Sequence, residues 1–318
     1  MKSDVPGVLC FGNLVVDTLA GPIPGEVRWD ATVWVDALEQ QIGGNGANTC
    51  FALATLGVPA RLVGTVGDDS FGDFVTGRLA GAGVDVAHIA RLNTPTPASI
   101  ALVRVDGARA LLHRPGASTE AFAKLPDLTA ELIAGCSVFH LANPFSMPNM
   151  RGQAAEALRR AQAAGLFTTM DTGWDSRGEW MRTIATALPF TDLLFTNEDE
   201  ARNLTGCPDA EAAATAFRDH GVKRVVVKLG GRGCLIADEN SRVQVPAFKV
   251  TAVDTTGAGD SFVGGFLAAR QRGFHLCDAA RFANAVAALS VQRMGATSGI
   301  LGFDDTLAWL QATSIRTD

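Results

Sequence analysis

The feature that most restricts the fold is a regular alternation of two patterns in the second half of the chain. Short apolar runs, typical of buried strands, alternate with longer segments whose apolar residues recur at helical spacing. The runs are 138–141, 167–171, 193–195 and 225–227, and the helical segments are 150–164, 178–187, 197–205 and 209–219. Such alternation favours a parallel sheet with helices on both faces, and therefore an α/β fold.

The first half of the chain continues this alternation. Residues 8–12 and residues 61–67 are short apolar runs, so both are predicted strands. Helical spacing begins at Gly43 and stops at Gly57, and a second helix is predicted over residues 71–82. These elements extend the same sheet and the same helical layers toward the N-terminus.

Two segments do not fit the alternation. Residues 14–42 alternate loosely between apolar and polar side chains and contain the turn residues Pro22 and Pro24, while residues 98–113 form a hairpin pattern. We assign both segments to a small β-sheet lid over one edge of the main sheet. No repeat and no low-complexity linker divides the sequence, so we expect residues 1–318 to form a single domain.

The composition excludes several classes of function. With 318 residues, of which 47% are hydrophobic, the chain can bury a large core. A net charge of −6 disfavours a nucleic-acid-binding protein, which needs a basic face. No apolar run approaches the roughly 18 residues of a membrane span, and the N-terminus lacks an apolar signal core, so a cytoplasmic protein without membrane association is expected. The six cysteines are scattered without a C-x-x-C pair, and the five histidines show no metal-binding spacing.

The segment 253–266 contains the strongest local indication of chemistry. Three small residues, Gly257, Ala258 and Gly259, lead directly into Asp260 and then into an apolar helical pattern. Such a turn presents backbone N–H groups at a helix N-terminus, where a phosphate or another anion binds. A carboxylate beside an anion site is suited to take a proton from a hydroxyl that attacks a phosphoryl group. The alternative is an ordinary glycine-rich turn that Asp260 caps.

Other polar residues gather where the predicted strands end. In parallel α/β sheets the ligand site lies beyond the carboxyl ends of the strands. The residues in such places are Asn13, Asp17, Gly43 to Asn48, Gly67 to Gly72, Asn143, Asp171, Asn197 to Glu200 and Gly230 to Gly233. Solvated residues without a function would be distributed over both ends of the sheet. The clustering therefore predicts a ligand site at this edge.

Four motifs, taken together, resemble those of the ribokinase-like, PfkB-type carbohydrate kinases. Residues 254–262 read D-T-T-G-A-G-D-S-F, residues 43–48 read G-G-N-G-A-N, residues 64–72 read G-T-V-G-D-D-S-F-G, and residues 197–200 match N-x-x-E. The resemblance covers nearly the whole chain. It implies a three-layer sandwich with a central, mostly parallel sheet and a β-sheet lid, and transfer of the γ-phosphate of ATP to a sugar hydroxyl. No Walker A sequence, GxxxxGK[ST], occurs.

The resemblance also implies roles for individual residues. Asp260 would be the catalytic base, and the anion hole would be formed by the backbone amides of Gly257, Ala258, Gly259 and Asp260. The acceptor sugar would be held by Asn13, Asp17, Gly43, Gly44, Asn48, Asn143 and Asp171. The nucleotide would be held by Asn197, Lys228, Gly230, Gly233, Thr256, Asn284, Gly295 and Ala296. Mg²⁺ would be organised, largely through water, by Asn197 and Glu200, and a monovalent cation such as K⁺ would bind beside Asp254 and Thr256.

Several of these residues have simpler interpretations. The acids among residues 197–200 also suit the first turn of a helix, where the helix dipole favours negative charge. Asp254 and Asp17 also suit turns that their carboxylates stabilise, and residues 43–48 also suit a plain strand-to-helix turn. Elsewhere, packing or local hydrogen bonding is expected for His113 and His140. The side chains of Arg104, Arg109 and Arg114 are expected to be solvated. The alternative is that one of these arginines binds a carboxylate or phosphate group of the substrate.

The motifs do not fix the acceptor. Ribokinases have Lys between the glycines of the sugar loop, where this chain has Asn45, and they carry a Glu near position 140, where this chain has residues 141–144, L-A-N-P. Residues 171–175, together with Trp180, are more similar to fructokinases and 2-keto-3-deoxygluconate kinases. The expected acceptor is a primary hydroxyl of a small sugar or sugar acid, because a flexible arm reaches Asp260 most easily.

Two other functions compete with the sugar-kinase interpretation. A nucleoside kinase would need a wider apolar lid to cover a base. A catalytically silent sugar-binding sensor would be expected to lack Asp260 or the glycines before it, and both are present. The apolar residues Val33, Val35 and Leu38 of the first lid segment also predict a homodimer through lid contacts, because a β lid has free edges and an apolar face.

Overall fold

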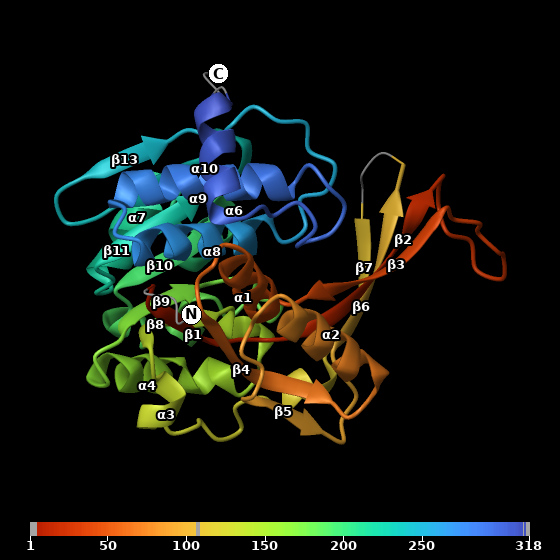
Figure 1. Cartoon of the computed structure of the whole chain (residues 1–318), viewed down its shortest axis with the longest axis horizontal. Coiled ribbons are helices and arrows are strands. Elements are labelled where there is room, and N and C mark those ends of the chain that lie inside the picture. The colour runs from red at the N-terminus through yellow and green to blue at the C-terminus, as the bar shows by residue number, and fades with distance from the viewer. Residues whose placement is uncertain (1–4, 106–108, 314, 316–318) are drawn as a thin grey trace.

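The larger sheet of the protein is mostly parallel, as the alternation of strands and helices predicts (Figure 1). The computed structural model describes residues 5–105, 109–313 and 315. Within these ranges nine strands lie in the order β13-β12-β11-β10-β9-β8-β1-β4-β5. Their bounds are β1 (Gly7–Phe11), β4 (Ala60–Gly67), β5 (Ile89–Leu92), β8 (Cys136–Ala142), β9 (Phe167–Asp171), β10 (Leu193–Asn197), β11 (Arg224–Lys228), β12 (Cys234–Ala237) and β13 (Arg242–Val245). Neighbours are parallel except at the β13 edge, where β12 is antiparallel to both β11 and β13.

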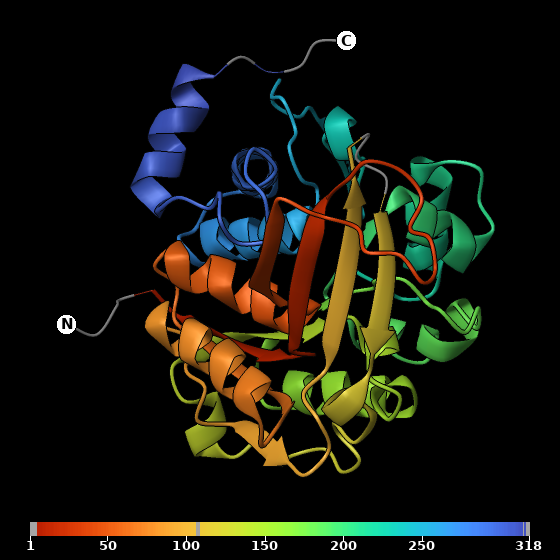
Figure 2. The ribbon, with the colours of Figure 1, turned by 90° about the vertical axis from the view of Figure 1, so that its right-hand side faces the viewer.

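The smaller sheet, which we call the lid sheet, is formed by the two segments predicted as ribbon. Its strands lie in the order β3-β2-β6-β7 and have the bounds β2 (Val15–Ile23), β3 (Ala37–Gly43), β6 (Ala98–Arg104) and β7 (Arg109–Arg114). The pairs β2–β3 and β6–β7 are antiparallel hairpins, whereas β2 and β6 pair in parallel. Figure 2 shows these strands running along one side of the helical layers. The predicted ribbon is interrupted, because residues 24–36 connect β2 to β3 without forming a strand.

Helices cover both faces of the larger sheet (Figure 1). The α-helices are α1 (Asn45–Thr55), α2 (Ser70–Gly81), α3 (Ala130–Ile133), α4 (Met150–Ala163), α5 (Met181–Ile184), α6 (Glu198–Thr205), α7 (Ala210–Asp219), α8 (Ala258–Gln271), α9 (Leu276–Ser290) and α10 (Phe303–Ala312). Four short 3₁₀ turns in the same described ranges are η1 (Gly116–Thr119), η2 (Pro144–Ser146), η3 (Leu188–Phe190) and η4 (Gly230–Arg232). Over the residues described, no helix combines the length and apolar character needed to cross a bilayer.

The two faces of the sheet carry two separate hydrophobic cores. Successive side chains of a strand point to opposite faces, so Val8 and Cys10 of β1 enter one core while Leu9 and Phe11 enter the other. The first core packs against α1, α8 and α9, and the second packs against α4, α6 and α7. Because both faces are buried, the central strands are apolar along their whole length, which is why they were recognisable as continuous apolar runs.

The prediction of a helix over residues 178–187 is wrong. Only the four residues of α5 and the short turn η3 are helical in this region. Trp180 has a φ of 47°, which a right-handed helix does not allow. The carboxylate of Asp175 accepts hydrogen bonds from the backbone amides of Arg177, Glu179 and Trp180, and this local bonding replaces the first helical turns.

The N-terminal limit of the first predicted helix also needs correction. Gly43 is the last residue of β3, and α1 begins only at Asn45. Gly44 lies between them with a φ of 93°, a left-handed conformation that ends the strand before the helix starts. The motif at residues 43–48 is therefore a strand-to-helix turn whose helical part carries Asn45 and Asn48.

Helix α8 crosses α1 at very short distance. A β-carbon built on Gly264 would lie 2.6 Å from Cβ of Ala52, which is closer than real carbon contacts. Glycine in the middle of a helix is unfavourable by itself, so its presence here is explained by this crossing. The crossing brings the first turn of α8 over the carboxyl ends of the strands.

Gly264→Ala is expected to destabilise the protein by roughly 1–3 kcal/mol, because the added methyl group overpacks the α1–α8 contact. Gly77→Ala is the matched control, since Gly77 is an exposed residue within α2 with open space around it. That control should stabilise the protein by about 0.5–1 kcal/mol through helix propensity. Urea unfolding of both variants measures the difference, and equal effects would contradict the packing argument.

Candidate functional site

The candidate site lies where the carboxyl ends of the parallel strands meet the first turn of α8. Asn143 follows β8, and Asp171, Asn197 and Lys228 are the last residues of β9, β10 and β11. A chain of hydrogen bonds connects this edge to α1 and α8. The edge of the sheet that the sequence predicts for ligand binding is thus the edge at which these side chains come together.

Asp260 is the third residue of α8 and is only 6% exposed. Its Oδ1 accepts a hydrogen bond of 2.8 Å from Nδ2 of Asn45, and its Oδ2 accepts one of 2.8 Å from Nδ2 of Asn48. Burial raises the pKa of Asp260, and Glu200 adds to this, while Asn48, Asn45 and Lys228 oppose it. A buried carboxylate with a raised pKa is a better proton acceptor than an exposed one.

The turn before α8 requires glycine. Gly257 has a φ of 68°, and a β-carbon on it would lie 2.4 Å from Cβ of Ala296. The first turn of a helix presents amides that have no acceptor within the helix. The amide of Ala258 already donates to the carbonyl of Thr255 at 3.3 Å. Gly259 and Asp260 supply the next amides, at the positive end of the helix dipole.

Lys228 and Asp171 form a buried ion pair beside this turn. Nζ of Lys228 donates to Oδ1 and Oδ2 of Asp171 at 2.8 Å and 2.9 Å. Burial raises the pKa of Asp171 to about 7, an effect that the Lys228 ammonium opposes and the carboxylates of Glu200 and Asp260 increase. A β-carbon built on Gly259 would lie 3.2 Å from Nζ, so the ammonium group lies against the first turn of α8.

The side chains of Asn143 and Asn13 form hydrogen bonds within the protein in this structure. Nδ2 of Asn143 donates to Oδ1 of Asn45 at 2.8 Å, and Oδ1 of Asn143 accepts from the amide of Ser146 at 3.3 Å. Oδ1 of Asn13 accepts from the backbone amide of Asn45 at 3.0 Å. Both residues therefore hold the turn that carries Asn45.

Glu200 and Asn197 form a capping box at the start of α6. The Asn197 side chain accepts from the amide of Glu200 at 2.8 Å, and Oε2 of Glu200 accepts from the amide of Asn197 at 3.1 Å. The hydroxyl of Thr172 also donates to Oε2, at 2.8 Å. This is the helix-start role that the sequence leaves open for these acids. No group of three His, Cys, Asp or Glu side chains gathers as a metal cluster within the described ranges.

Asp254 clamps the loop before α8. Its Oδ1 accepts hydrogen bonds from the amide and the hydroxyl of Thr256 at 2.9 Å and 2.7 Å, and its Oδ2 accepts from the amide of Gly295 at 2.9 Å. These bonds match the alternative of a turn-stabilising acid. Gly295 lies against the lid sheet, because a β-carbon on it would overlap the side chain of Gln41 in β3.

A cavity of about 280 Å³ opens beside the first turn of α8. It is lined by Lys228, Gly230, Gly231, Gly233, Ala247, Phe248, Val250, Ala252, Thr255, Ala258, Gly259, Phe262, Asn284, Ala287, Ala288 and Val291. Four of the predicted nucleotide-binding residues are in this lining, whereas Gly295 packs on Gln41 and Ala296 packs on Gly257. The apolar wall of this cavity was not identified from the sequence. The signal was present, because Ala287, Ala288 and Val291 follow Asn284 at helical spacing on α9 and at its end.

Asp17 faces the main body from the centre of the lid sheet. Its Oδ2 would lie 2.1 Å from a β-carbon on Gly43, so the carboxylate packs against the start of the motif at residues 43–48. Burial raises the pKa of Asp17, while a hydrogen bond from Ser99 and the nearby His113 lower it. Oγ of Ser99 and Nδ1 of His113 are 3.0 Å apart. The prediction of local hydrogen bonding for His113 agrees with this contact, and Ser99 was not identified from the sequence.

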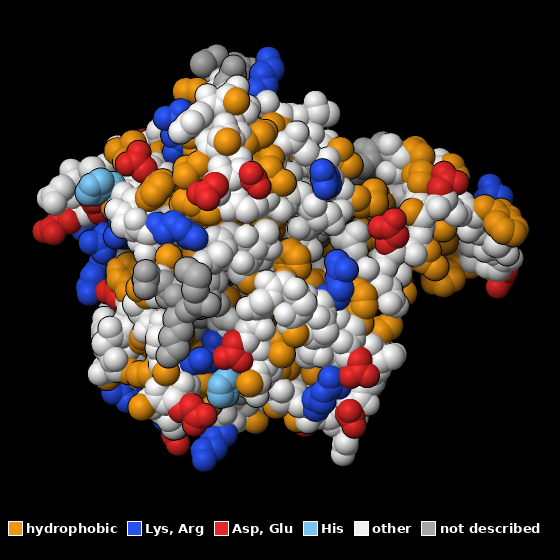
Figure 3. All heavy atoms as spheres, viewed as in Figure 1, with side chains coloured by type: hydrophobic (Ala, Val, Ile, Leu, Met, Phe, Trp, Pro, Cys, Tyr) orange, Lys and Arg blue, Asp and Glu red, His pale blue; other side chains and the backbone are white. Residues whose placement is uncertain are grey.

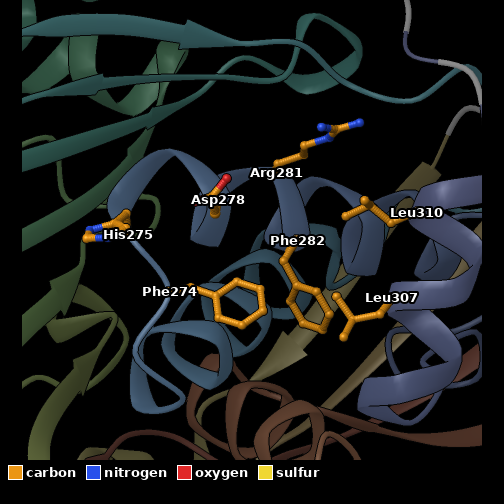
Figure 4. A pocket seen from close by; sticks show the side chains of 7 residues that line it. All are labelled: Phe274, His275, Asp278, Arg281, Phe282, Leu307 and Leu310. Carbon is orange, nitrogen blue, oxygen red and sulfur yellow. The ribbon is translucent and has the colours of Figure 1, made fainter.

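A second pocket, of about 270 Å³, lies away from this site (Figure 4). It is lined by Phe274, His275, Asp278, Arg281, Phe282, Leu307 and Leu310, which belong to α9, to α10 and to the turn that precedes α9. This turn follows the C-terminal end of α8, about 17 Å along that helix from Asp260. The pocket is therefore separate from the cavity at the N-terminus of α8.

Comparison with known proteins agrees with the family resemblance of the motifs over nearly the whole chain. A family model described as pfkB family carbohydrate kinase matches residues 8–301. Fructokinase-1 of Oryza sativa subsp. japonica is 31% identical over 310 residues, covering 91% of this chain and 93% of that protein. An ATP-dependent ribose-1-phosphate kinase of Halopiger xanaduensis is 33% identical over 287 residues, covering 86% and 92%. The structure of a putative ribokinase II from E. coli in complex with ATP and Mg²⁺ has a TM-score of 0.84 at 27% identity, covering 97% and 100%.

Lys228→Met should destabilise the protein increasingly as the pH rises. Without the ammonium group, the pKa of Asp171 rises further, so the carboxyl is neutral near pH 5 but is buried as an unpaired anion near pH 9. Breaking a buried ion pair from one side costs about 3–5 kcal/mol, which we expect at the higher pH. Urea unfolding at the two pH values measures this change.

The matched control is Lys223→Met. Lys223 pairs with Asp192 at 2.6 Å, but its side chain is 59% exposed, and the pKa of Asp192 is lowered, chiefly by its hydrogen bonds to Lys223 and Thr168 against the effect of burial. Asp192 is therefore ionised at both pH values, and the effect of the substitution should be small and independent of pH. A Lys228→Met effect that is equally independent of pH would contradict the assignment of a buried pair.

Proposed function

The chain belongs to the PfkB family of carbohydrate kinases, and from this premise we propose that it transfers the γ-phosphoryl group of ATP to a primary hydroxyl of a small sugar or sugar acid. The observation that carries the proposal is the position of Asp260. This buried carboxylate lies in the first turn of α8, next to amides that suit a phosphate and beside the Lys228 ammonium group.

In the proposed reaction, Asp260 takes the proton of the acceptor hydroxyl. The hydroxyl oxygen then forms a bond to the γ-phosphorus as the bond between that phosphorus and the leaving ADP oxygen breaks. Phosphoryl transfer requires mainly positioning and stabilisation of negative charge. The backbone of Gly259 in the first turn of α8 and the Nζ group of Lys228 lie close together, which supports a role for both in stabilising that charge.

The nucleotide is proposed to bind in the cavity beside α8. Lys228, Gly230 and Gly233 line the end near the phosphate site, and Asn284 lies in the wall formed by α9. Asn284 donates to the carbonyls of Val245 and Pro246 at 3.2 Å and 3.1 Å, which fixes this wall. The apolar surface around it suits the flat face of a base.

Mg²⁺ is proposed to accompany the nucleotide, held through water by Asn197 and Glu200. Both hydrogen bonds that Glu200 receives fall on Oε2, and a buried carboxylate near the phosphate cavity suits an ion that keeps most of its waters. When bound, Mg²⁺ supplies positive charge to the phosphate oxygens. A monovalent cation such as K⁺ beside Asp254 and Thr256 is a further proposal, and no step described here depends on it.

The acceptor is proposed to bind between Asp17 of the lid sheet and Asn48 of α1, above Gly43 and Gly44. Oδ1 of Asn48 is buried and, among the described residues, has no hydrogen-bond partner. A hydroxyl group of a sugar would satisfy this atom. Asp171 and Asn143, which the sequence also suggests as sugar ligands, are engaged with Lys228 and Asn45. We therefore propose that they support the site from within the protein.

An acceptor screen tests the proposal. Purified protein with ATP and Mg²⁺ is assayed for ADP release with fructose, ribose, 2-keto-3-deoxygluconate, ribose 1-phosphate and adenosine. Turnover of a free sugar or sugar acid is expected. Turnover of adenosine alone would support the alternative of a nucleoside kinase, and binding of a sugar without ADP release would support the sensor. The sensor is disfavoured, because Asp260 and the glycines before it are retained.

A cytoplasmic location is part of the proposal. All six cysteines carry free thiols, and three of them are buried. Unpaired cysteines suit a reducing compartment, where disulfides are rare. ATP is also available as a donor there.

Asp260→Asn should lower kcat by about 10²–10⁴-fold and leave the Kd of ATP nearly unchanged, because only proton acceptance is removed. The matched control is Asp278→Asn, since Asp278 is the third residue of α9 just as Asp260 is the third residue of α8. The control should retain its rate. An Asp260→Asn variant that keeps more than about a tenth of the rate would overturn the assignment of the base.

The outer face of the lid sheet supports a homodimer. By strand register Ile100 and Leu112 lie side by side on the face away from Asp17, and Leu38 lies on the same face. They are 44%, 61% and 70% exposed, and Figure 3 shows hydrophobic side chains on the projecting lid. Val33 and Val35, expected to be exposed, are instead half-buried in the loop before β3. We propose that a second copy covers this face.

The protein is expected to have the mass of a dimer at micromolar concentration, as measured by light scattering. Leu112→Glu should give the mass of a monomer, because it places a charge within the apolar face. Val243→Glu is the control, since Val243 is an exposed apolar residue on β13 at the opposite edge of the molecule. A monomeric wild-type protein would refute the proposed dimer.

A further inference from the structure

Four asparagine and aspartate side chains form a continuous hydrogen-bonded chain at the proposed base. Nδ2 of Asn143 donates to Oδ1 of Asn45, and Nδ2 of Asn45 donates to Oδ1 of Asp260, each at 2.8 Å. On the other side Nδ2 of Asn48 donates to Oδ2 of Asp260, also at 2.8 Å. Each oxygen of the carboxylate therefore receives one bond from an uncharged amide.

We propose that Asn45 is a positioning residue that holds the Asp260 carboxylate in place and keeps it ionised, and that Asn143 sets the orientation of the Asn45 amide. This inference rests on the proposed function, because it assigns Asp260 the role of base. It adds to that function a pair of residues that act through Asp260.

The orientation of Asn45 matters because the two ends of its amide have opposite effects. With Nδ2 toward Asp260 the amide donates to the carboxylate. In the reversed orientation Oδ1 would face a carboxylate oxygen, and the two acceptors would repel each other. The bond from Asn143 occupies Oδ1 of Asn45, so it selects the favourable orientation.

Asn143 is itself fixed by the backbone around it. Oδ1 of Asn143 accepts a hydrogen bond of 3.3 Å from the backbone amide of Ser146. The hydroxyl of Ser146 donates a second bond, of 2.9 Å, to the backbone carbonyl of Asn143. Its φ of 49° and the close approach of Gly173, where a β-carbon would lie 2.2 Å from Cγ of Asn143, restrict its side chain further. The chain of amides is thus anchored at the carboxyl end of β8.

Uncharged donors suit a base better than a cation would. Burial raises the pKa of Asp260, and the bonds from Asn48 and Asn45 lower it again without placing a charge against the carboxylate. The titratable groups that face it are Lys228 from β11, Glu200 from α6, Asp171 from β9 and Cys10 from β1. The carboxylate that does pair with an ammonium group is Asp171, which therefore has the role of holding Lys228.

The test compares Asn45→Ala, Asn45→Lys and Asn143→Ala with wild type in the pH dependence of kcat/KM for the acceptor found by the screen. Loss of a hydrogen-bond donor raises the pKa of a carboxyl group. Asn45→Ala should therefore move the acidic limb of the profile upward by roughly one pH unit. Asn143→Ala should move it in the same direction by less, and Asn45→Lys, which brings a positive charge, should move it downward. Asn203→Ala, on the exposed face of α6, is the control and should leave it unchanged.

A second measurement does not require turnover. With ¹³C-labelled aspartate carboxyls, the Asp260 resonance is assigned by its absence in Asp260→Asn, and its titration midpoint should shift in the same directions as the acidic limb. A rate lowered equally at every pH, with an unchanged midpoint, would overturn the inference and leave the proposed function intact. If no acceptor on the panel is phosphorylated, the proposed function fails, and the titration midpoint alone decides the role of Asn45.

Discussion

The close approach of α8 to its neighbours is the constraint on which the site depends. Gly257 lies against Ala296, Gly264 against Ala52 and Gly265 against Val286, and in each case a β-carbon would lie less than 3.0 Å from the other residue. Larger residues at these positions would lift the helix away from α1 and α9. The first turn would then move from the strand ends, and Asp260 would lose the amides of Asn45 and Asn48.

The buried charges at this edge are compensated in three different ways. Asp171 is paired with the Lys228 ammonium group, whereas Asp260 is held by neutral amides. Glu200 shares its charge with the backbone of α6 through a capping box. A buried ion is costly unless it is hydrogen-bonded, and each of these carboxylates accepts hydrogen bonds from a different set of partners. The proposed chemistry uses Asp260, the carboxylate that is held by two side-chain amides rather than by an ammonium group.

Local patterns predicted the fold and the candidate site at the carboxyl ends of the strands, but not the hydrogen-bond partners of the side chains that gather there. Strand and helix spacing and the glycines at residues 257–259 depend on short stretches of sequence, so they were readable directly. The bonds from Lys228 to Asp171 and from Asn143 to Asn45 span 57 and 98 residues and arise only when the strands assemble. The prediction of a helix over residues 178–187 was wrong because Asp175, which is held by Arg151 from α4, accepts hydrogen bonds from the backbone amides at the start of that segment.

The parallel pairing of β2 with β6 has a consequence for the order of folding. Val16 pairs with Ala98, and the intervening chain includes β4, α1, α2 and β5, which belong to the larger sheet and its helical layer. Closing so long a loop in an unfolded chain is entropically unfavourable, and contacts of large sequence separation slow folding. We therefore expect the larger sheet to bring the two lid hairpins together before they pair. Asp17, on the central strand β2 of the lid sheet, should therefore reach its final surroundings only after β1, β4 and β5 of the larger sheet have assembled.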